Sequence, residues 1–169
     1  EPQGAARLQE LALQQLNGTL AEVRHISHAL RPALLDTLGL AAALQHLADE
    51  FDAAGGTHFQ ARVEGEEVDL PEAVKTALFR IAQEALNNAA RHAHATTVGL
   101  VLRFEDDGGI TLEIHDDGQG FDAEAAQAVA DQGLGLRSMR ERAAALGARL
   151  SLITAPGLGS RLAVKLTAA

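Results

Sequence analysis

The sequence predicts an α/β (α+β) fold, a two-layer sandwich in which helices cover one face of a mixed sheet. Its composition supports a core: 47% of the 169 residues are hydrophobic, but only 3% are aromatic, so aliphatic side chains must fill the interior. The hydrophobic period changes from helical to alternating near residue 55. Beyond that point a helix, strands, a glycine-rich loop, a second helix and further strands follow one another, an order typical of an α/β sandwich.

Residues 1–54 carry a helical pattern without strand-like alternation. The pattern is interrupted at Arg31-Pro32, because proline removes a backbone donor, and it resumes as far as Phe51. We expect two helical stretches with a kink between them. Such a stripe cannot bury itself alone, which predicts pairing with a second copy, a homodimer, or with upstream sequence. The apolar positions before the kink are Leu8, Leu11, Leu16, Leu20, Val23, Ile26 and Leu30.

Residues 55–169 are expected to form one α/β domain after the break at Gly55-Gly56. Asp69 is predicted to cap a helix whose first turn contains Pro71. The turn at residues 106–109 and the glycines at 157–159 each predict a hairpin. The predicted strands are residues 58–63, 98–104, 110–115, 150–153 and 161–166. The predicted helices run from the cap at Asp69 to about residue 93 and over residues 138–146.

Charge and composition exclude several classes. The net charge of -9 argues against nucleic acid as the main partner, because phosphate binding draws on excess Lys and Arg. The absence of cysteine excludes disulfides and thiolate metal sites. No apolar run approaches the ~18 residues that span a bilayer, and no signal peptide opens the chain, so we expect a soluble piece.

The helix around residue 85 carries a polar triplet at the edge of its apolar stripe. At about 100° per residue, Glu84, Asn88 and Arg91 fall within an arc of roughly 60°. The triplet fits either a binding site beside the core or a solvated helix shoulder with an i,i+4 pair.

An acidic turn follows the strand that ends near residue 115. In Asp116-Asp117-Gly118-Gln119-Gly120, alternating glycines allow close approach of a ligand, and a carboxylate can accept a hydrogen bond from an exocyclic amine such as that of adenine. The alternative is an ordinary hairpin turn. The acids do not follow the spacing of an EF-hand calcium loop.

Two further glycine motifs come later in the chain. Gly133-Leu134-Gly135-Leu136 precedes a predicted helix, where free N–H groups and the helix dipole favour phosphate oxygens. It matches neither a Walker nor a Rossmann motif. Gly157-Leu158-Gly159-Ser160 lies in the last hairpin, where the Ser160 hydroxyl could approach Asp116; the alternative is a plain turn.

Together these motifs resemble the ATP-binding domain of the GHKL (Bergerat) superfamily, which includes histidine kinases, gyrase-type ATPases and Hsp90. The resemblance covers residues 58–167. The stretch from Glu84 to His92 is similar to the family's N box, and the three glycine motifs are similar to its glycine boxes in the same order. The resemblance implies ATP and Mg²⁺ as cofactors.

The resemblance also implies a role for each motif residue. Asn88 would coordinate Mg²⁺ and Asp116 would bind the adenine amine, while Glu84 would serve as the catalytic base or proton acceptor. The other implied ATP-binding residues are Arg91, His92, Gly118, Gly120, Gly133, Leu134, Gly135, Leu136 and Ser160.

The N-terminal segment resembles the second dimerisation helix of sensor histidine kinases that signal to NarL/LuxR-type response regulators. The resemblance rests on residues 22–35, with Leu30-Arg31-Pro32, and on Gly39-Leu40. It implies a response regulator of that type as partner, a homodimer, and the cytoplasmic portion of a parent protein associated with a bacterial inner membrane.

The histidine that accepts the phosphoryl group in such kinases is expected to lie outside this chain. Only His115 precedes an acid, and it ends a strand inside the nucleotide motif. His25 and His28 share a helix face but lack the carboxylates of a metal site. The alternatives are an anti-sigma-type Ser/Thr kinase, a gyrase-like ATPase, which needs a further lysine-bearing domain, or a non-catalytic dimer module.

Overall fold

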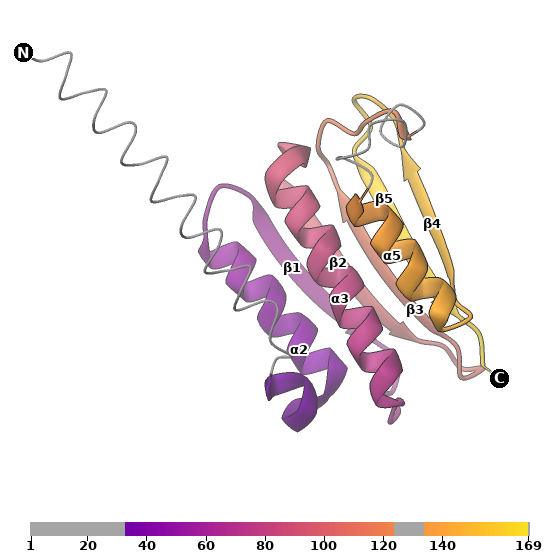
Figure 1. Cartoon of the computed structure of the whole chain (residues 1–169). Helices are drawn as coiled ribbons and strands as arrows, with labels where there is room; N and C mark the ends of the chain where they lie inside the picture. Colours follow the sequence, from indigo (N-terminus) through magenta and orange to yellow (C-terminus); the bar gives the residue numbers. More distant parts are fainter. Residues whose placement is uncertain (1–32, 124–133, 169) are drawn as a thin grey trace, which may run out of the picture. The chain divides into compact units, whose positions relative to one another are not determined.

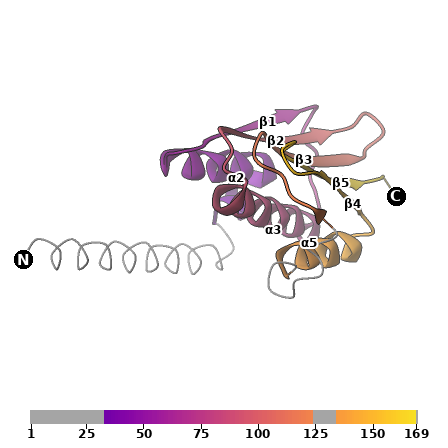
Figure 2. The ribbon, with the colours of Figure 1, turned by 90° about the horizontal axis from the view of Figure 1, so that it is seen from above.

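The computed structural model describes residues 33–123 and 134–168. From Leu34 onward the described residues belong to one compact unit, in which a five-stranded mixed sheet carries the described helices on one face (Figures 1 and 2). This confirms the predicted fold class. In chain order the elements are α2 (Ala33–Ala53), β1 (His58–Glu64), α3 (Glu72–Asn88), the π-helix η1 (Ala89–Ala93), β2 (Thr97–Phe104), β3 (Ile110–Asp116), α5 (Leu134–Ala145), β4 (Arg149–Thr154) and β5 (Ser160–Leu166).

The strand order is β1-β2-β3-β5-β4, with β1 and β2 parallel and every other neighbouring pair antiparallel. Both predicted hairpins are therefore confirmed. The register places Asp116, at the end of β3, opposite Val98 on one side and Ser160 on the other. The end of β3 is thus flanked by the beginnings of β2 and β5, which brings the first and third glycine motifs to one end of the sheet.

The core lies between the sheet and the helical layer. Alternate residues of β2 and β3 point into it, which is the pattern expected of a sheet with one covered face. Among the described helices, none is long and apolar enough to cross a membrane. The largest fully buried side chains are Leu35, Leu40, Leu44, Leu47, Leu78, Ile81, Leu86, Val98, Leu100, Leu102, Leu112 and Met139.

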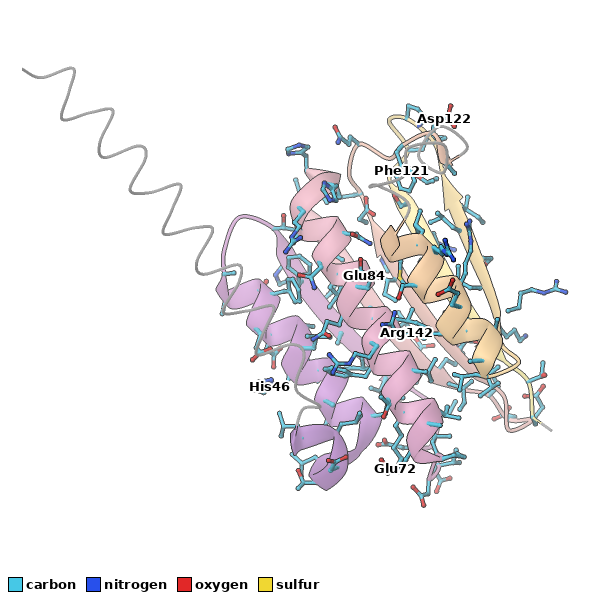
Figure 3. The ribbon with its side chains drawn as sticks, viewed as in Figure 1. His46, Glu72, Glu84, Phe121, Asp122 and Arg142 are labelled. Atoms are coloured by element: carbon cyan, nitrogen blue, oxygen red, sulfur yellow. The ribbon has the colours of Figure 1, made fainter. Side chains whose placement is uncertain are left out.

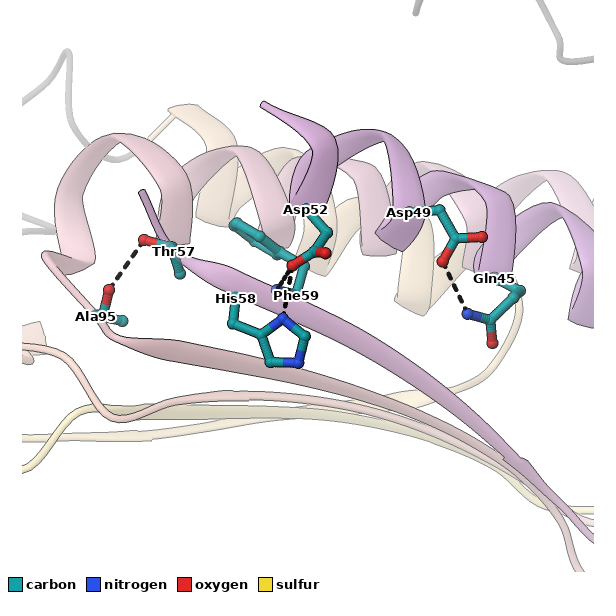
Figure 4. A network of polar contacts seen from close by, with 7 residues as sticks. All are labelled: Gln45, Asp49, Asp52, Thr57, His58, Phe59 and Ala95. Carbon is teal, nitrogen blue, oxygen red and sulfur yellow. Dashed lines mark hydrogen bonds and ion pairs between the residues drawn. The ribbon is translucent and has the colours of Figure 1, made fainter. Parts of the chain in front are cut away.

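Helix α2 packs into the same core, which differs from the expected domain boundary near residue 54. Leu44 and Leu47 are buried in the cluster that also contains the sheet residues, and the compact unit begins at Leu34. The end of α2 is fastened to β1 by Asp52, whose carboxylate accepts bonds from the Phe59 N–H at 2.9 Å and from His58 Nδ1 at 2.7 Å (Figure 4). The Phe59 N–H, with His58, lowers the pKa of Asp52.

Two predicted helix starts were wrong in detail. Pro71 occupies the N-cap of α3 in an extended conformation, and Asp69 accepts from Lys75 Nζ at 3.0 Å instead of capping the helix. Helix α5 begins at Leu134, ahead of the expected start at residue 138, because Leu136 and Met139 share a buried face. Arg31-Pro32 lies outside the described residues, but Gly39, with φ 84°, interrupts α2 itself.

The predicted end of the third helix near residue 93 is confirmed, with a change of winding. The last turn, Ala89–Ala93, is a π-helix, and His94 follows in the left-handed region at φ 50°. A π-turn is wider than an α-turn and is often found at functional sites. The last carbonyls of this π-helix face the turn that follows β3. The carbonyls of His92 and Ala93 accept hydrogen bonds from Gln119 in that turn.

Candidate functional site

Glu84 lies on the side of α3 that faces α5 (Figure 3), and Asn88, one helical turn later, also lies close to α5. Both are half-buried. A Cβ atom added to Gly135, in the first turn of α5, would lie less than 3.0 Å from Glu84 Oε1 and 3.4 Å from Asn88 Nδ2. The structure thus brings Gly135, of the second glycine motif, against Glu84 and Asn88, and a side chain at residue 135 would displace the Glu84 carboxylate.

Arg91, the third member of the triplet, lies beyond Asn88 in the π-turn and is exposed, as is His92. The predicted arc assumed α-helical winding, which ends at Asn88. Both side chains are therefore exposed beyond the α-helical part of this helix, unlike the half-buried Glu84 and Asn88. Gly133, His25 and His28 lie outside the described residues.

Asp116 ends β3 half-buried, and its Oδ1 accepts a hydrogen bond from the Gly118 N–H at 2.9 Å. The glycines around it are tightly packed. A Cβ on Gly118 would lie less than 3.0 Å from the Ala93 carbonyl oxygen, and one on Gly159 equally close to the carbonyl oxygen of Asp116. The π-turn, the acidic turn and the last hairpin therefore meet backbone to backbone around Asp116.

Ser160 lies half-buried next to Asp116 in the register of β3 and β5, as the sequence predicted. Its hydroxyl is 3.2 Å from Thr154 Oγ1, which also accepts from the Phe121 N–H at 3.1 Å. Leu136 contributes to the core rather than to a loop, and the structure places Leu134 at the first position of α5.

His115 points to the opposite face of the sheet, because side chains alternate along β3. Its imidazole lies over Gly99 of the neighbouring strand, and its Nδ1 is 3.9 Å from Glu113 Oε1. It takes no part in the arrangement around Asp116.

Asp117 and Gln119 were missed as site residues by the sequence reasoning. Asp117 binds Thr96 and Thr97, and Gln119 binds the end of the π-turn. The hairpin register carried a signal for Asp117: once β2 and β3 pair, the residue after β3 must lie near the residues that begin β2. No comparable signal pointed to Gln119, whose contacts depend on the π-turn.

The donor set fits a magnesium–nucleotide complex. Mg²⁺ prefers oxygen ligands and keeps water and phosphate in its coordination shell, so one or two protein oxygens suffice. The Asn88 amide and the Glu84 carboxylate supply such oxygens one helical turn apart, and no group of three or more potential ligands (His, Cys, Asp, Glu) exists among the described residues. When bound, Mg²⁺ would neutralise phosphate charge.

Residues 73–169 match the family described as histidine kinase-, DNA gyrase B-, and HSP90-like ATPase. The chain belongs to this family. The resemblance seen in the glycine motifs is thereby confirmed, and this ATPase-family domain is an ATP-binding domain. The matched residues contain α3 from its second residue onward, α5 and the strands from β2 to β5.

Two curated relatives are histidine kinases by name. The chain is 40% identical over 140 residues to the sensor histidine kinase MctS of Rhizobium johnstonii, covering 83% of this chain and 30% of the relative. It is 37% identical over 158 residues to the signal transduction histidine-protein kinase/phosphatase UhpB of Salmonella typhimurium, covering 91% and 30%. The chain thus spans about a third of the length of these relatives.

A solved structure shows the same fold. The histidine kinase domain of the Erythrobacter litoralis EL346 blue-light activated histidine kinase superposes with a TM-score of 0.60 at 23% identity, over 76% of this chain and 60% of that one. At this level of identity the likeness concerns the fold alone. It agrees with the mixed sheet and one-sided helical layer of the ATPase-family domain.

Proposed function

We propose that the chain is the ATP-binding catalytic part of a sensor histidine kinase. In this proposal the longer protein transfers the γ-phosphoryl of ATP to a histidine on an upstream helix, and then to an aspartate of a NarL/LuxR-type response regulator. The observation that carries it is the approach of Gly135 to Glu84 and Asn88, which joins a helix N-terminus to a carboxylate and an amide. The sensor kinases among the relatives support the same reading.

Each residue has a part in this proposal. Asp116 accepts the adenine amine and Ser160 lies beside it, while Asn88 supplies an oxygen to Mg²⁺. The first turn of α5, with Arg91 and His92, faces the phosphates, and Glu84 accepts the proton of the attacking group. Phosphoryl transfer depends mainly on positioning and charge neutralisation, so such contacts suffice for catalysis.

Partner and location are part of the same proposal. The Leu30-Arg31-Pro32 and Gly39-Leu40 motifs support a NarL/LuxR-type regulator and a homodimer formed through the segment of residues 1–54. They also support a cytoplasmic domain of a parent protein associated with a bacterial inner membrane.

Calorimetric titration with ATP, with and without Mg²⁺, tests nucleotide binding by this chain. The wild type should bind, and Asn88→Ala should lose the part of the affinity that depends on Mg²⁺. Asn87→Ala is the matched control, because Asn87 is the same residue type, also half-buried, one position earlier on α3. If the wild type did not bind ATP, the non-catalytic dimer module would be the better reading.

Labelling with γ-³²P ATP tests the transfer step. The chain alone should bind ATP without becoming labelled, whereas the longer protein should carry acid-labile phosphohistidine that is lost to a regulator aspartate. Label on His25 or His28 would contradict an upstream acceptor. Acid-stable phosphoserine or phosphothreonine on an added protein would favour the Ser/Thr kinase alternative instead.

A further inference from the structure

Asp117 is exposed at the surface, yet its carboxylate is saturated with hydrogen bonds. Oδ1 accepts from the backbone N–H of Thr96 at 2.8 Å and of Thr97 at 2.9 Å. Oδ2 accepts from the hydroxyl of Thr97 at 2.9 Å and also from the hydroxyl of Thr96. The Asp117 N–H in turn donates to the Thr97 carbonyl at 3.3 Å. One side chain thus fastens the acidic turn to the beginning of β2.

Gln119 fastens the same turn to the π-turn. Its backbone N–H donates to the Ala93 carbonyl at 2.7 Å, and its Nε2 donates to the His92 carbonyl at 2.8 Å. Between the two anchors, Gly118 packs directly on Ala93. The turn that carries Asp116 is therefore held on both sides, by Asp117 and by Gln119, to the segment that links η1 to β2.

We propose that Asp117 is a positioning residue for nucleotide binding: it holds the Asp116 carboxylate at a fixed distance from the end of the π-turn and does not itself contact the nucleotide. This inference rests on the function proposed above. Both of its oxygens are already occupied by Thr96 and Thr97, which leaves Asp116 to accept the base. A turn that is already held in its binding conformation loses less conformational entropy when the ligand binds.

The carboxylate pKa agrees with this assignment. Hydrogen bonds from Thr96 and Thr97 hold the pKa of Asp117 well below its usual range, so the side chain is a permanent acceptor at neutral pH. An asparagine could keep most of these contacts, since its amide oxygen accepts the two N–H bonds and its NH₂ can donate to the hydroxyl oxygens. An alanine would lose all four side-chain bonds.

The test compares Asp117→Ala, Asp117→Asn and Asp107→Ala by calorimetric titration with ATP and with ADP in the presence of Mg²⁺. Asp107 is the matched control, because its Oδ1 also accepts a backbone N–H in a turn, at the other end of β3. Asp117→Ala should bind both nucleotides about tenfold more weakly, since they share the base. Asp117→Asn should stay within about twofold of wild type, and Asp107→Ala should bind like wild type.

Two outcomes would overturn the inference. A folded Asp117→Ala that binds like wild type would show that the clamp does not support binding. An Asp117→Asn variant as weak as Asp117→Ala would show that the charge acts on the ligand directly. Failure of wild type itself to bind would instead remove the proposed function.

A pair of milder variants covers the case in which Asp117→Ala does not fold. Thr96→Val and Thr97→Val each remove one hydroxyl donor and retain the backbone bonds. Combined, they should weaken ATP binding by about threefold, and unchanged affinity would contradict the inference. In an Asp117→Ala background that folds, Thr97→Val should add no further loss, because the two residues act as one unit.

Discussion

The two ends of β3 carry turns with the same local chemistry and different surroundings. At one end, Asp107 Oδ1 accepts the Gly109 N–H at 2.9 Å; at the other, Asp116 Oδ1 accepts the Gly118 N–H at 2.9 Å. Each turn is an Asp-x-Gly sequence closed by a side-chain bond two residues ahead. The local hydrogen bonding of the two turns is therefore the same.

Their packing separates them. A Cβ on Gly109 would first meet the Asp107 carboxylate at 2.9 Å, which is the mobile end of a side chain, and then the Leu166 carbonyl at 3.2 Å. A Cβ on Gly118 would collide with the backbone of Ala93 in the π-turn. The hairpin at residues 105–109 is a connection, whereas the turn at residues 116–120 is a junction of three elements. The difference shows that a glycine motif becomes a candidate site through what packs on it.

The largest expected effect is that of Gly118→Ala compared with Gly109→Ala. Because the new methyl would meet backbone, Gly118→Ala should lower the free energy of unfolding by about 1–3 kcal/mol and prevent ATP binding. Gly109→Ala should cost less than about 1 kcal/mol and leave binding intact. Urea unfolding and calorimetric titration measure both. Equal losses at the two glycines would remove the distinction between the turns.

A second comparison concerns the two aspartates. Asp116→Ala should weaken ATP binding by about 10- to 100-fold, the value of a hydrogen bond to a charged group, because the base loses its acceptor. Asp107→Ala removes the equivalent turn bond far from the nucleotide and should leave the affinity unchanged. Titration of both variants with ATP and Mg²⁺ decides the matter, and a loss of affinity in Asp107→Ala would mean that the hairpin turn also supports the site.

The smallest expected effect is a pH dependence of stability from Asp117. Its pKa is lowered in the folded state from an ordinary value of 3.8, so its contribution to stability is present above that value and is lost as the pH falls further. Wild type should therefore have a larger free energy of unfolding than Asp117→Asn at neutral pH, and this difference should shrink below about pH 4. Unfolding in urea from pH 7 to pH 3 measures the difference.

Thr97→Val provides the control for this dependence. It removes one of the hydrogen bonds that lower the pKa of Asp117, so the dependence on pH should become weaker. A stability difference between wild type and Asp117→Asn that stayed constant down to pH 3 would contradict the proposed cause.

Much of the fold followed from the sequence because its signals are local. Alternation along β2 and β3 and the turn at residues 106–109 indicated the hairpin, and the apolar stripe of α3 indicated its buried face. The error at Asp69 arose because proline is favoured in the first turn of a helix, so the prediction placed the cap before Pro71. In the structure Pro71 itself is the N-cap. The assignment of α2 failed for a different reason: an amphipathic stripe does not reveal whether a second chain or this chain's own sheet will cover it.

The candidate site could be predicted from the sequence only in part. The motifs around Asn88, Asp116 and Ser160 could be identified from residue types and spacing, and their order indicated a nucleotide-binding family. Asp117 and Gln119 were missed because their partners lie about 20 residues or more away in sequence and are mostly backbone atoms, which leave no trace in composition.

The sequence by itself thus determined which residues have the chemistry to bind a nucleotide, since that depends on side-chain type. Only the tertiary structure showed how differently the two Asp-Gly turns are packed. Asp107 and Asp116 form the same bond to a following glycine, but only Gly118 lies against the carbonyl that ends a π-turn. The reason is that a backbone can pack this closely only on a residue without a Cβ atom, and such close packing arises only when segments distant in sequence meet.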